Sequence, residues 1–359
     1  MWAIHSRSTV FEHYKEWKAA SPGNPIVYCG PNGEEFLYEF AVEKDGEYLG
    51  YVVVSASRDY GPILMLSNGG KRPSAYLPLA REKATELGYI DEGYSGDPIY
   101  RYSGGLSYGV QFGERMKKEQ ITIHLPTGRV EKMPKDVKVM RGKDEARAAW
   151  QRAEERIESE KFGLEPYYEY NKISGVPAWY QSSYNGGHGD DGDDEGESYP
   201  DCAGSPDDPW DAWDGHAPVA GAMVLGYWAD HGYPDIDDDD DTLIDDCHHY
   251  MVTDDEGATS WLYIANGIEE VSELYGYAFD CDKDGFVSWS DVTGEVDDDK
   301  PAELFIDAFD GGGSHCVTLV GYYILDEVEY LIIHNTWHTS EHDYEFGDWD
   351  NAHLYRVAP

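Results

Sequence analysis

The chain has 359 residues, of which 41% are hydrophobic and 14% aromatic, and its formal net charge at pH 7 is −44. This length and apolar content are enough for two domains with hydrophobic cores, which excludes a disordered chain. No apolar run reaches the roughly 18 residues that span a membrane, and a charge of this sign repels nucleic-acid phosphates. We therefore expect neither a membrane span nor a nucleic-acid partner.

The negative charge is concentrated in one half of the chain. Residues 1–162 hold 23 Lys+Arg and 24 Asp+Glu, a net charge of −1, whereas residues 163–359 hold 4 and 47, a net charge of −43. Repulsion on that scale destabilises a compact state at low ionic strength, whereas molar salt reduces the screening length to about 3 Å. We expect a salt-adapted protein. The first ten residues lack the apolar core of a signal peptide, so the chain is either cytoplasmic or lacks its leader; we favour an extracellular or cell-surface protein in a salt-rich environment.

The predicted elements begin with an amphipathic segment at residues 11–20, followed by a strand pair. Residues 34–57, EEFLYEFAVEKDGEYLGYVVVSAS, form two strand-like runs around the turn KDGEY and predict a β-hairpin. A helix is predicted at residues 75–89, and further strands at 100–112 and 119–133. These elements indicate a small α+β domain over residues 1–135.

A long helix is predicted next, at residues 143–161. One stripe of this helix is apolar: Ala146, Ala149, Trp150, Ala153 and Ile157. We assign residues 136–175 to a basic connecting helix and linker. Residues 181–211 are rich in Gly, Asp and Pro without periodicity, which predicts a surface loop.

A buried helix is predicted from the stretch WDGHAPVAGAMVLGYW, residues 213–228. Pro218 suits its first turn, and Asp214 is the expected cap. Residues 219–228 carry no charge, so this helix belongs inside a core, with its free N–H groups and positive dipole end directed into the protein. Such a terminus is suited to hold a thiolate or an oxyanion.

The rest of the chain predicts a second helix at residues 260–277 and strands at 314–324 and 329–337. With the buried helix, these elements predict a second α+β domain over residues 176–359, in which a central buried helix packs on an antiparallel or mixed sheet.

Three motifs occur in a characteristic order: WDGHAPVAGAMVLGYWADHGYP at 213–234, SHCVTLVGYY at 314–323 and YLIIHNTW at 330–337. Their order and spacing resemble those of papain-like cysteine peptidases related to the bacteriocin-leader-processing (double-glycine) peptidases. Residues 38–67 resemble, more loosely, the cystatin-like propeptide of streptopain-type peptidases, and the acidic composition is of the haloarchaeal type.

The resemblance implies roles for four residues. His315 falls on the general base and Asn335 on the residue that orients it, while Gln181 is a candidate oxyanion donor. The nucleophile position, a cysteine in the family, falls on His216. The family mechanism needs a thiolate, which imidazole cannot supply, and the helix dipole would keep His216 neutral. We therefore expect a catalytically inactive homologue that acts as a binding or structural protein, with a protein or peptide partner in the groove.

An active peptidase or hydrolase is the alternative, and it needs another reactive group. Cys316 follows His315 on a strand and points to the opposite face, and Cys247 follows two aspartates that raise the pKa of its thiol. Cys202, in the loop 14 residues before His216, could reach His315 as a substitute nucleophile. A transition metal shared by His216 and His315 is the other route.

Residues 280–291, DCDKDGFVSWSD, fit the spacing of an EF-hand calcium loop. The candidate Ca²⁺ ligands are Asp280, Asp282, Asp284, the Phe286 carbonyl, Ser288 and Asp291. The last ligand is Asp instead of Glu, and a chain this rich in Asp also produces such spacings by chance.

The resemblance also implies a place for the first domain. In the related peptidases the propeptide lies across the active-site groove until it is cut away. With no competent nucleophile to release it, we expect residues 1–135 to stay attached and docked through apolar residues such as Trp150 and Ile157.

Overall fold

The computed structural model describes residues 2–134, 143–160, 168–181, 214–237, 239–254, 257–307, 313–349 and 351–359. The first part of the chain, up to residue 134, forms α1 (Trp2–Val10), η1 (Glu12–Trp17), β1 (Ser21–Pro22), β2 (Ile26–Cys29), β3 (Glu35–Lys44), β4 (Glu47–Ser55), β5 (Ile63–Asn68), η2 (Pro73–Tyr76), α2 (Leu77–Glu86), β6 (Ile99–Gly104), β7 (Ser107–Gln111), α3 (Gly113–Glu119), β8 (Ile121–His124) and β9 (Val130–Lys132). Helix α4 (Lys143–Glu160) follows. The second part, from residue 168, forms β10 (Tyr168–Lys172), α5 (His216–Asp230), α6 (Asp240–Tyr250), α7 (Ile264–Leu274), β11 (Asp280–Asp284), α8 (Trp289–Asp297), β12 (Ala302–Asp307), β13 (Ser314–Leu325), β14 (Val328–His334), β15 (Glu341–Glu345) and β16 (Asn351–Ala358).

The predicted α+β class is confirmed. The segments predicted as strands at 100–112 and 119–133 each form two short strands instead, β6 with β7 and β8 with β9, because a turn interrupts each of them. The hairpin β3–β4 turns at Asp45 and Gly46, whose φ angles of +53° and +85° belong to the tight turn that matches the twist of paired strands. The helices predicted at 75–89, 143–161 and 260–277 correspond to α2, α4 and α7. Strand β10, which pairs with β13, lies inside the segment predicted to be a linker.

The strands of the described residues join into one mixed sheet, in the order β11-β16-β12-β13-β14-β15-β5-β4-β3-β2-β6-β7-β8-β9, with β1 on β3 and β10 on β13. All pairs are antiparallel except β2–β6. The sheet passes from the second part to the first where β15 pairs with β5, with Tyr344 opposite Met65 and Asp343 opposite Leu66. The division at residues 135 and 175 stays a prediction, because backbone hydrogen bonds run across it.

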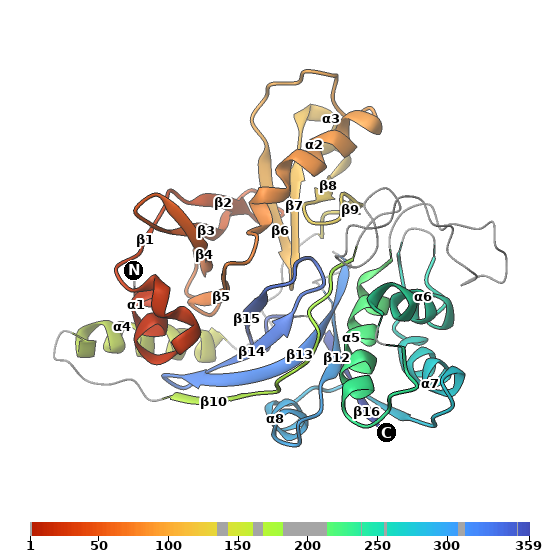
Figure 1. The fold of residues 1–359 in the computed structure, drawn as a ribbon. Helices are drawn as coiled ribbons and strands as arrows, with labels where there is room; N and C mark the ends of the chain where they lie inside the picture. Colours follow the sequence, from red (N-terminus) through yellow and green to blue (C-terminus); the bar gives the residue numbers. More distant parts are fainter. Residues whose placement is uncertain are drawn as a thin grey trace.

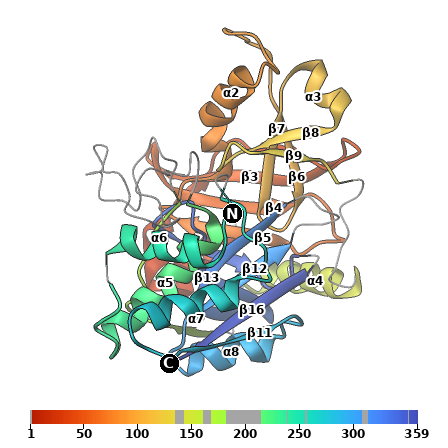
Figure 2. The ribbon, with the colours of Figure 1, turned by 90° about the vertical axis from the view of Figure 1, so that its right-hand side faces the viewer.

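Helix α5 is the predicted central helix, and 13 of its 15 residues are buried. It packs on β12 and β13, with α6 and α7 stacked outside it (Figures 1 and 2). Helix α8 covers the other face of these strands: Leu304 of β12 clusters with Val292 of α8, whereas its neighbour Phe305 clusters with α5. This alternation is the period-two pattern of a strand buried on both faces.

The start of α5 corrects one expectation. The helix begins at His216 and its N-cap is Gly215, with no side-chain cap, so the prediction of Asp214 as the cap was wrong. Gly215 has a φ of +91°, and a Cβ atom there would lie 2.7 Å from the carbonyl oxygen of Gly257. The close approach of the 257 loop therefore requires glycine at the cap position.

The two parts of the chain share buried apolar clusters, which confirms that they dock through apolar contact. One cluster combines Val52 and Leu66 of the first part with Val320 and Ile332 of the second. The expectation for α4 is wrong for Ile157, and the contact shown for Trp150 is with the first part; Ala149 of the same stripe is the residue buried in this cluster. Trp150 is half-buried and donates to the Tyr60 carbonyl at 2.8 Å, whereas Ile157 is exposed because it lies on the solvent side of the helix.

Among the described residues, none of the helices is both long enough and apolar enough to cross a bilayer.

Candidate functional site

The residues predicted at the nucleophile and base positions meet at one point. His216 opens α5, and His315 is the second residue of β13, on the sheet that carries this helix. Their ring centroids are 4.9 Å apart, with the ring planes inclined at 58°. The structure therefore brings together two imidazoles where the family resemblance implies a thiol and an imidazole.

Hydrogen bonds fix the proton positions on both rings. The backbone N–H of Cys316 can only donate, so His216 Nδ1, 3.1 Å away, accepts and His216 carries its proton on Nε2. The Asn335 carbonyl can only accept, so His315 Nε2, 2.7 Å away, donates to it. The Thr336 hydroxyl lies 3.2 Å from the same nitrogen. His216 is left without a free lone pair, whereas His315 keeps one on Nδ1.

Burial keeps both rings neutral. It lowers the pKa of His315 to about 3 and that of His216 well below its ordinary value, and each ring would further oppose a charge on the other. The positive dipole end at the N-terminus of α5 likewise disfavours a positive charge on His216. The site therefore has no imidazolium at neutral pH.

Asn335 and Gln181 also lie at this site. Asn335 holds His315 through its backbone carbonyl, while its side-chain oxygen accepts from the Trp337 amide at 3.1 Å. Gln181 is bound through its backbone N–H to the Thr336 carbonyl at 2.8 Å. The side-chain nitrogen of Gln181 is buried and has no hydrogen-bond partner among the described residues, and its role as an oxyanion donor stays a prediction.

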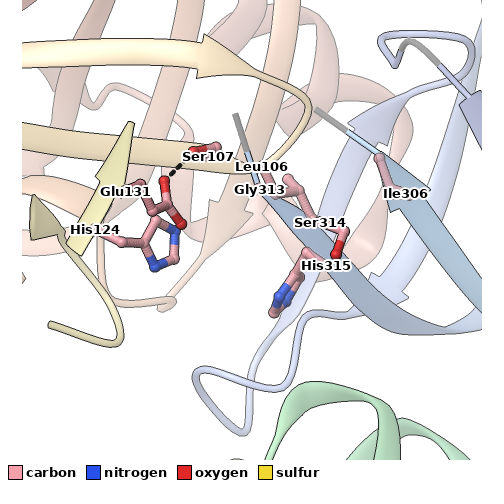
Figure 3. A pocket seen from close by; sticks show the side chains of 8 residues that line it. All are labelled: Leu106, Ser107, His124, Glu131, Ile306, Gly313, Ser314 and His315. Atoms are coloured by element: carbon pink, nitrogen blue, oxygen red, sulfur yellow. Dashed lines mark hydrogen bonds between the residues drawn. The ribbon is translucent and has the colours of Figure 1, made fainter. Parts of the chain in front are cut away.

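The first part of the chain covers the site. A pocket of about 10 Å³, with room for one water molecule, lies between the two parts, and Figure 3 shows the side chains that line it. From the first part it is lined by Leu106, Ser107, His124 and Glu131, and from the second by Ile306, Gly313, Ser314 and His315. The covering residues come from β7, β8 and β9 and from the turn that precedes β7.

Two contacts hold this cover in place. The indole of Trp337 lies between the two parts, against the ring of His315 at a centroid distance of 4.3 Å and against the ring of His124 at 5.5 Å. The Glu131 carboxylate accepts from the Ser107 hydroxyl at 2.9 Å, and a Cβ atom at Gly313 would lie 2.9 Å from it. Burial raises the pKa of Glu131 to about 7.

The cysteines in the described part of the chain give the site no reactive thiol. Cys316 is buried, and burial beside Glu303 raises the pKa of its thiol well above the ordinary value. Burial and Asp246 do the same to Cys247. Cys202, the predicted substitute nucleophile, lies outside the described residues.

The segment predicted as a calcium loop forms a paired strand and the start of a helix. Among the described residues, no group of three or more His, Cys, Asp or Glu side chains is placed to hold a metal ion. Asp280, Asp282 and Asp284 lie on β11, paired with β16, and Phe286 is exposed. Ser288 and Asp291 form the capping box of α8. Arg356 lies within 4 Å of both Asp284 and Asp291. Calcium binding by this segment stays a prediction.

No sequence pattern indicated the covering residues. His124 and Glu131 lie in an ordinary strand pair, and only the tertiary structure brings them to His315. Trp337 belongs to the third motif, so its position beside the base could have been inferred from its place after Asn335.

Comparison with known proteins adds one likeness. No protein-family model and no curated protein sequence matches the chain. The chain is similar to a solved fragment of Prevotella intermedia prointerpain A, a variant in which a cysteine is replaced by alanine. The TM-score is 0.46 and the identity 12%, over 94% of this chain and 98% of that one.

Proposed function

We propose that this chain is a papain-like cysteine-peptidase homologue that does not cleave peptide bonds and acts as a binding or structural protein. The observation that carries the proposal is the state of His216. The ring stands at the nucleophile position, and its Nδ1 lone pair is occupied by the Cys316 amide while Nε2 carries the proton. The side chain therefore offers no electron pair for attack on a carbonyl carbon.

The second ring cannot compensate. A cysteine peptidase depends on a thiolate that is stabilised by an adjacent imidazolium. His315 keeps the orientation of a general base, because the Asn335 carbonyl holds its Nε2, but it has no thiol to deprotonate among the described residues. The held imidazole of His315 and the buried side-chain nitrogen of Gln181, which has no hydrogen-bond partner among the described residues, support the proposal of a peptidase groove without its nucleophile.

The covered groove supports the same function. The first part places His124 and Glu131 against the entrance to His315, and it shares a buried apolar core with the second part. A peptidase homologue that cannot cleave its own chain keeps the first part over His315. We extend the proposal to a salt-rich extracellular or cell-surface setting, for which the support is the net charge of −44.

The test is peptidase activity of the full chain in molar salt. Wild-type protein, His216→Cys and the double variant His216→Cys/His315→Ala are incubated with an unfolded, fluorescently quenched protein substrate, with and without iodoacetamide. We expect no cleavage by the wild type. We expect iodoacetamide-sensitive cleavage or self-processing by His216→Cys that the double variant lacks.

Cleavage by the wild type would contradict the proposal, and further variants then assign it. Activity that is lost in Cys202→Ala supports the substitute thiol. Activity that is lost on chelation, restored by added zinc and absent from His216→Ala supports a metal held by His216 and His315.

A further inference from the structure

Four large apolar side chains stand exposed together on the acidic second part of the chain. Trp261, Leu262 and Tyr263 are consecutive in the loop before α7 and are 37%, 59% and 47% exposed. Phe286, between β11 and α8, is 93% exposed. We refer to these four residues as the Trp261 patch. These side chains are exposed even though the first part is docked, so the residues that cover His315 do not cover this surface.

The loop and the residue before Phe286 both approach His353. Its ring stacks on Trp261 with a centroid distance of 4.8 Å and an interplanar angle of 14°. A Cβ atom on Gly285, the residue before Phe286, would lie 3.3 Å from His353 Nδ1. The two segments of the patch, which are distant in sequence, therefore meet at His353.

Trp261 in this patch is held in place by two contacts. The Tyr355 hydroxyl donates to the Trp261 carbonyl at 2.6 Å, and Lys283 Nζ lies 3.8 Å from the Trp261 ring centroid. Both residues belong to paired strands of the sheet. A surface that is held in place before binding loses little conformational entropy when a partner docks.

The patch adjoins the candidate functional site. Across three neighbouring strands, Cys316 pairs with Phe305 and Phe305 with His353. Adjacent strands lie about 4.8 Å apart, so His353 lies about 10 Å from Cys316, whose amide holds His216. The same loop packs its Gly257 carbonyl against Gly215 at the start of α5. A chain bound on the patch would therefore lie beside the covered groove.

The charge of the segment that contains the patch selects the occupant; in the structure the Asp284 carboxylate accepts from the Phe286 amide, and Lys283 lies on Trp261. Residues 251–299 hold 14 Asp and Glu against one Lys. Nucleic acid and anionic lipid are repelled by such a surface, whereas lysine and arginine are attracted. Molar salt screens this attraction and strengthens apolar association, so exposed Trp, Leu, Tyr and Phe are costly in a salt-adapted chain unless a partner covers them.

We propose that the Trp261 patch binds a cationic polypeptide segment, in which aliphatic or aromatic side chains dock on the patch and flanking Lys or Arg side chains meet the surrounding carboxylates. The proposal specifies the partner of the binding function proposed above, and it depends on different residues. Peptidase activity in the wild type would overturn that function and leave this surface unaffected.

The experiment measures binding of a fluorescein-labelled 16-residue peptide of alternating Lys and Leu to the full chain at low and at molar potassium chloride. Two matched peptides replace Lys by Glu or Leu by Ser. The test variant is Leu262→Asp/Phe286→Asp, and the control variant is Leu87→Asp/Tyr168→Asp, whose native side chains are each 51% exposed elsewhere on the molecule. Thermal melting checks that both variants are folded.

We expect the test variant to weaken binding of the Lys/Leu peptide at least tenfold, even though it adds two negative charges, and the control variant to change it less than twofold. Both matched peptides should bind more weakly to the wild type. Equal binding of the Lys/Ser peptide, or an unchanged dissociation constant in the test variant, would overturn the proposal. Self-association or vesicle binding that the test variant abolishes would overturn it in favour of a second copy or a membrane.

Discussion

The two parts of this chain differ greatly in charge and yet share one sheet and one set of buried clusters. The first 162 residues are almost neutral, whereas the remaining 197 have a net charge of −43. Their contact includes the strand pair β5–β15 and apolar clusters that draw residues from both parts. Because the first part is almost neutral, opposite net charge does not hold the two parts together. Apolar burial joins them, together with buried hydrogen bonds such as that from the Tyr14 hydroxyl to Asp343, and the apolar contribution becomes stronger in salt.

Ion pairs between the parts are few among the described residues, and they lie at one place. Arg152 and Arg156 of α4 approach Glu327 and Asp326 in the turn between β13 and β14, each at 3.7 Å. The predicted basic contact therefore exists, but it lies at the edge of the apolar interface. Three changes test how much each kind of contact contributes.

Leu66→Ala should have the largest effect. Leu66 lies on β5 opposite Asp343 of β15 and is fully buried in the cluster with Val320 and Ile332. Loss of its side chain leaves a cavity in the interface, so we expect the free energy of unfolding to fall by about 2–5 kcal/mol. Urea unfolding in molar salt, followed by fluorescence and circular dichroism, measures this decrease in the free energy of unfolding.

Leu87→Ala is the control, because Leu87 is exposed on the first part and its removal should change stability by less than about 0.5 kcal/mol. Both parts should unfold in one transition. Two separate transitions, with only one of them moved by Leu66→Ala, would show that the parts are independent domains.

Glu131→Gln should have the next largest effect, and it depends on pH. Burial raises the pKa of Glu131 to about 7, so the stability it contributes is fully present below its ordinary value of 4.5 and is lost as the pH rises through 7. Glutamine carries no charge. We expect the variant to match the wild type at pH 5 and to exceed it by about 1–3 kcal/mol at pH 8.

Chemical unfolding at several pH values measures this difference, with Glu114→Gln as the exposed control. A difference between wild type and Glu131→Gln that stays constant from pH 5 to pH 8 would show that Glu131 is ionised in the folded protein.

The Arg152–Glu327 pair should have the smallest effect. Glu327 is largely exposed, and exposed pairs contribute at most about 1 kcal/mol. A double-mutant cycle with Arg152→Ala and Glu327→Ala should give a coupling energy below that limit in dilute buffer and none in molar salt. A larger coupling that persists in salt would mean that charge, and not only apolar burial, joins the parts.

Much of the fold could be predicted because its signals are local. The apolar run 219–228 determines a buried helix, and the turn at Asp45 and Gly46 determines a hairpin, whatever surrounds them. The ends of the helices were harder to predict. Asp214 is a good cap by residue type, but the 257 loop approaches so closely that Gly215 takes that position.

In the candidate site, too, the sequence was enough to select the residues but not to determine their protonation. The order of the motifs was enough to select His216, His315 and Asn335, because each stands at a recognisable start or end of an element. Which nitrogen of each ring carries the proton depends on the Cys316 amide and the Asn335 carbonyl, and these are set by the register of β13 and by the turn after β14.

The sequence by itself determined that a thiol is missing from the start of α5, that the second part is strongly acidic, and which segments are helices and strands, because these are properties of residue type and short-range periodicity. Long-range packing alone determined that Glu131 and His124 cover His315, that β5 joins β15, and that Gly285 and Trp261 both lie against His353. Those contacts join residues far apart in the chain, and no local pattern encodes which buried surfaces will meet.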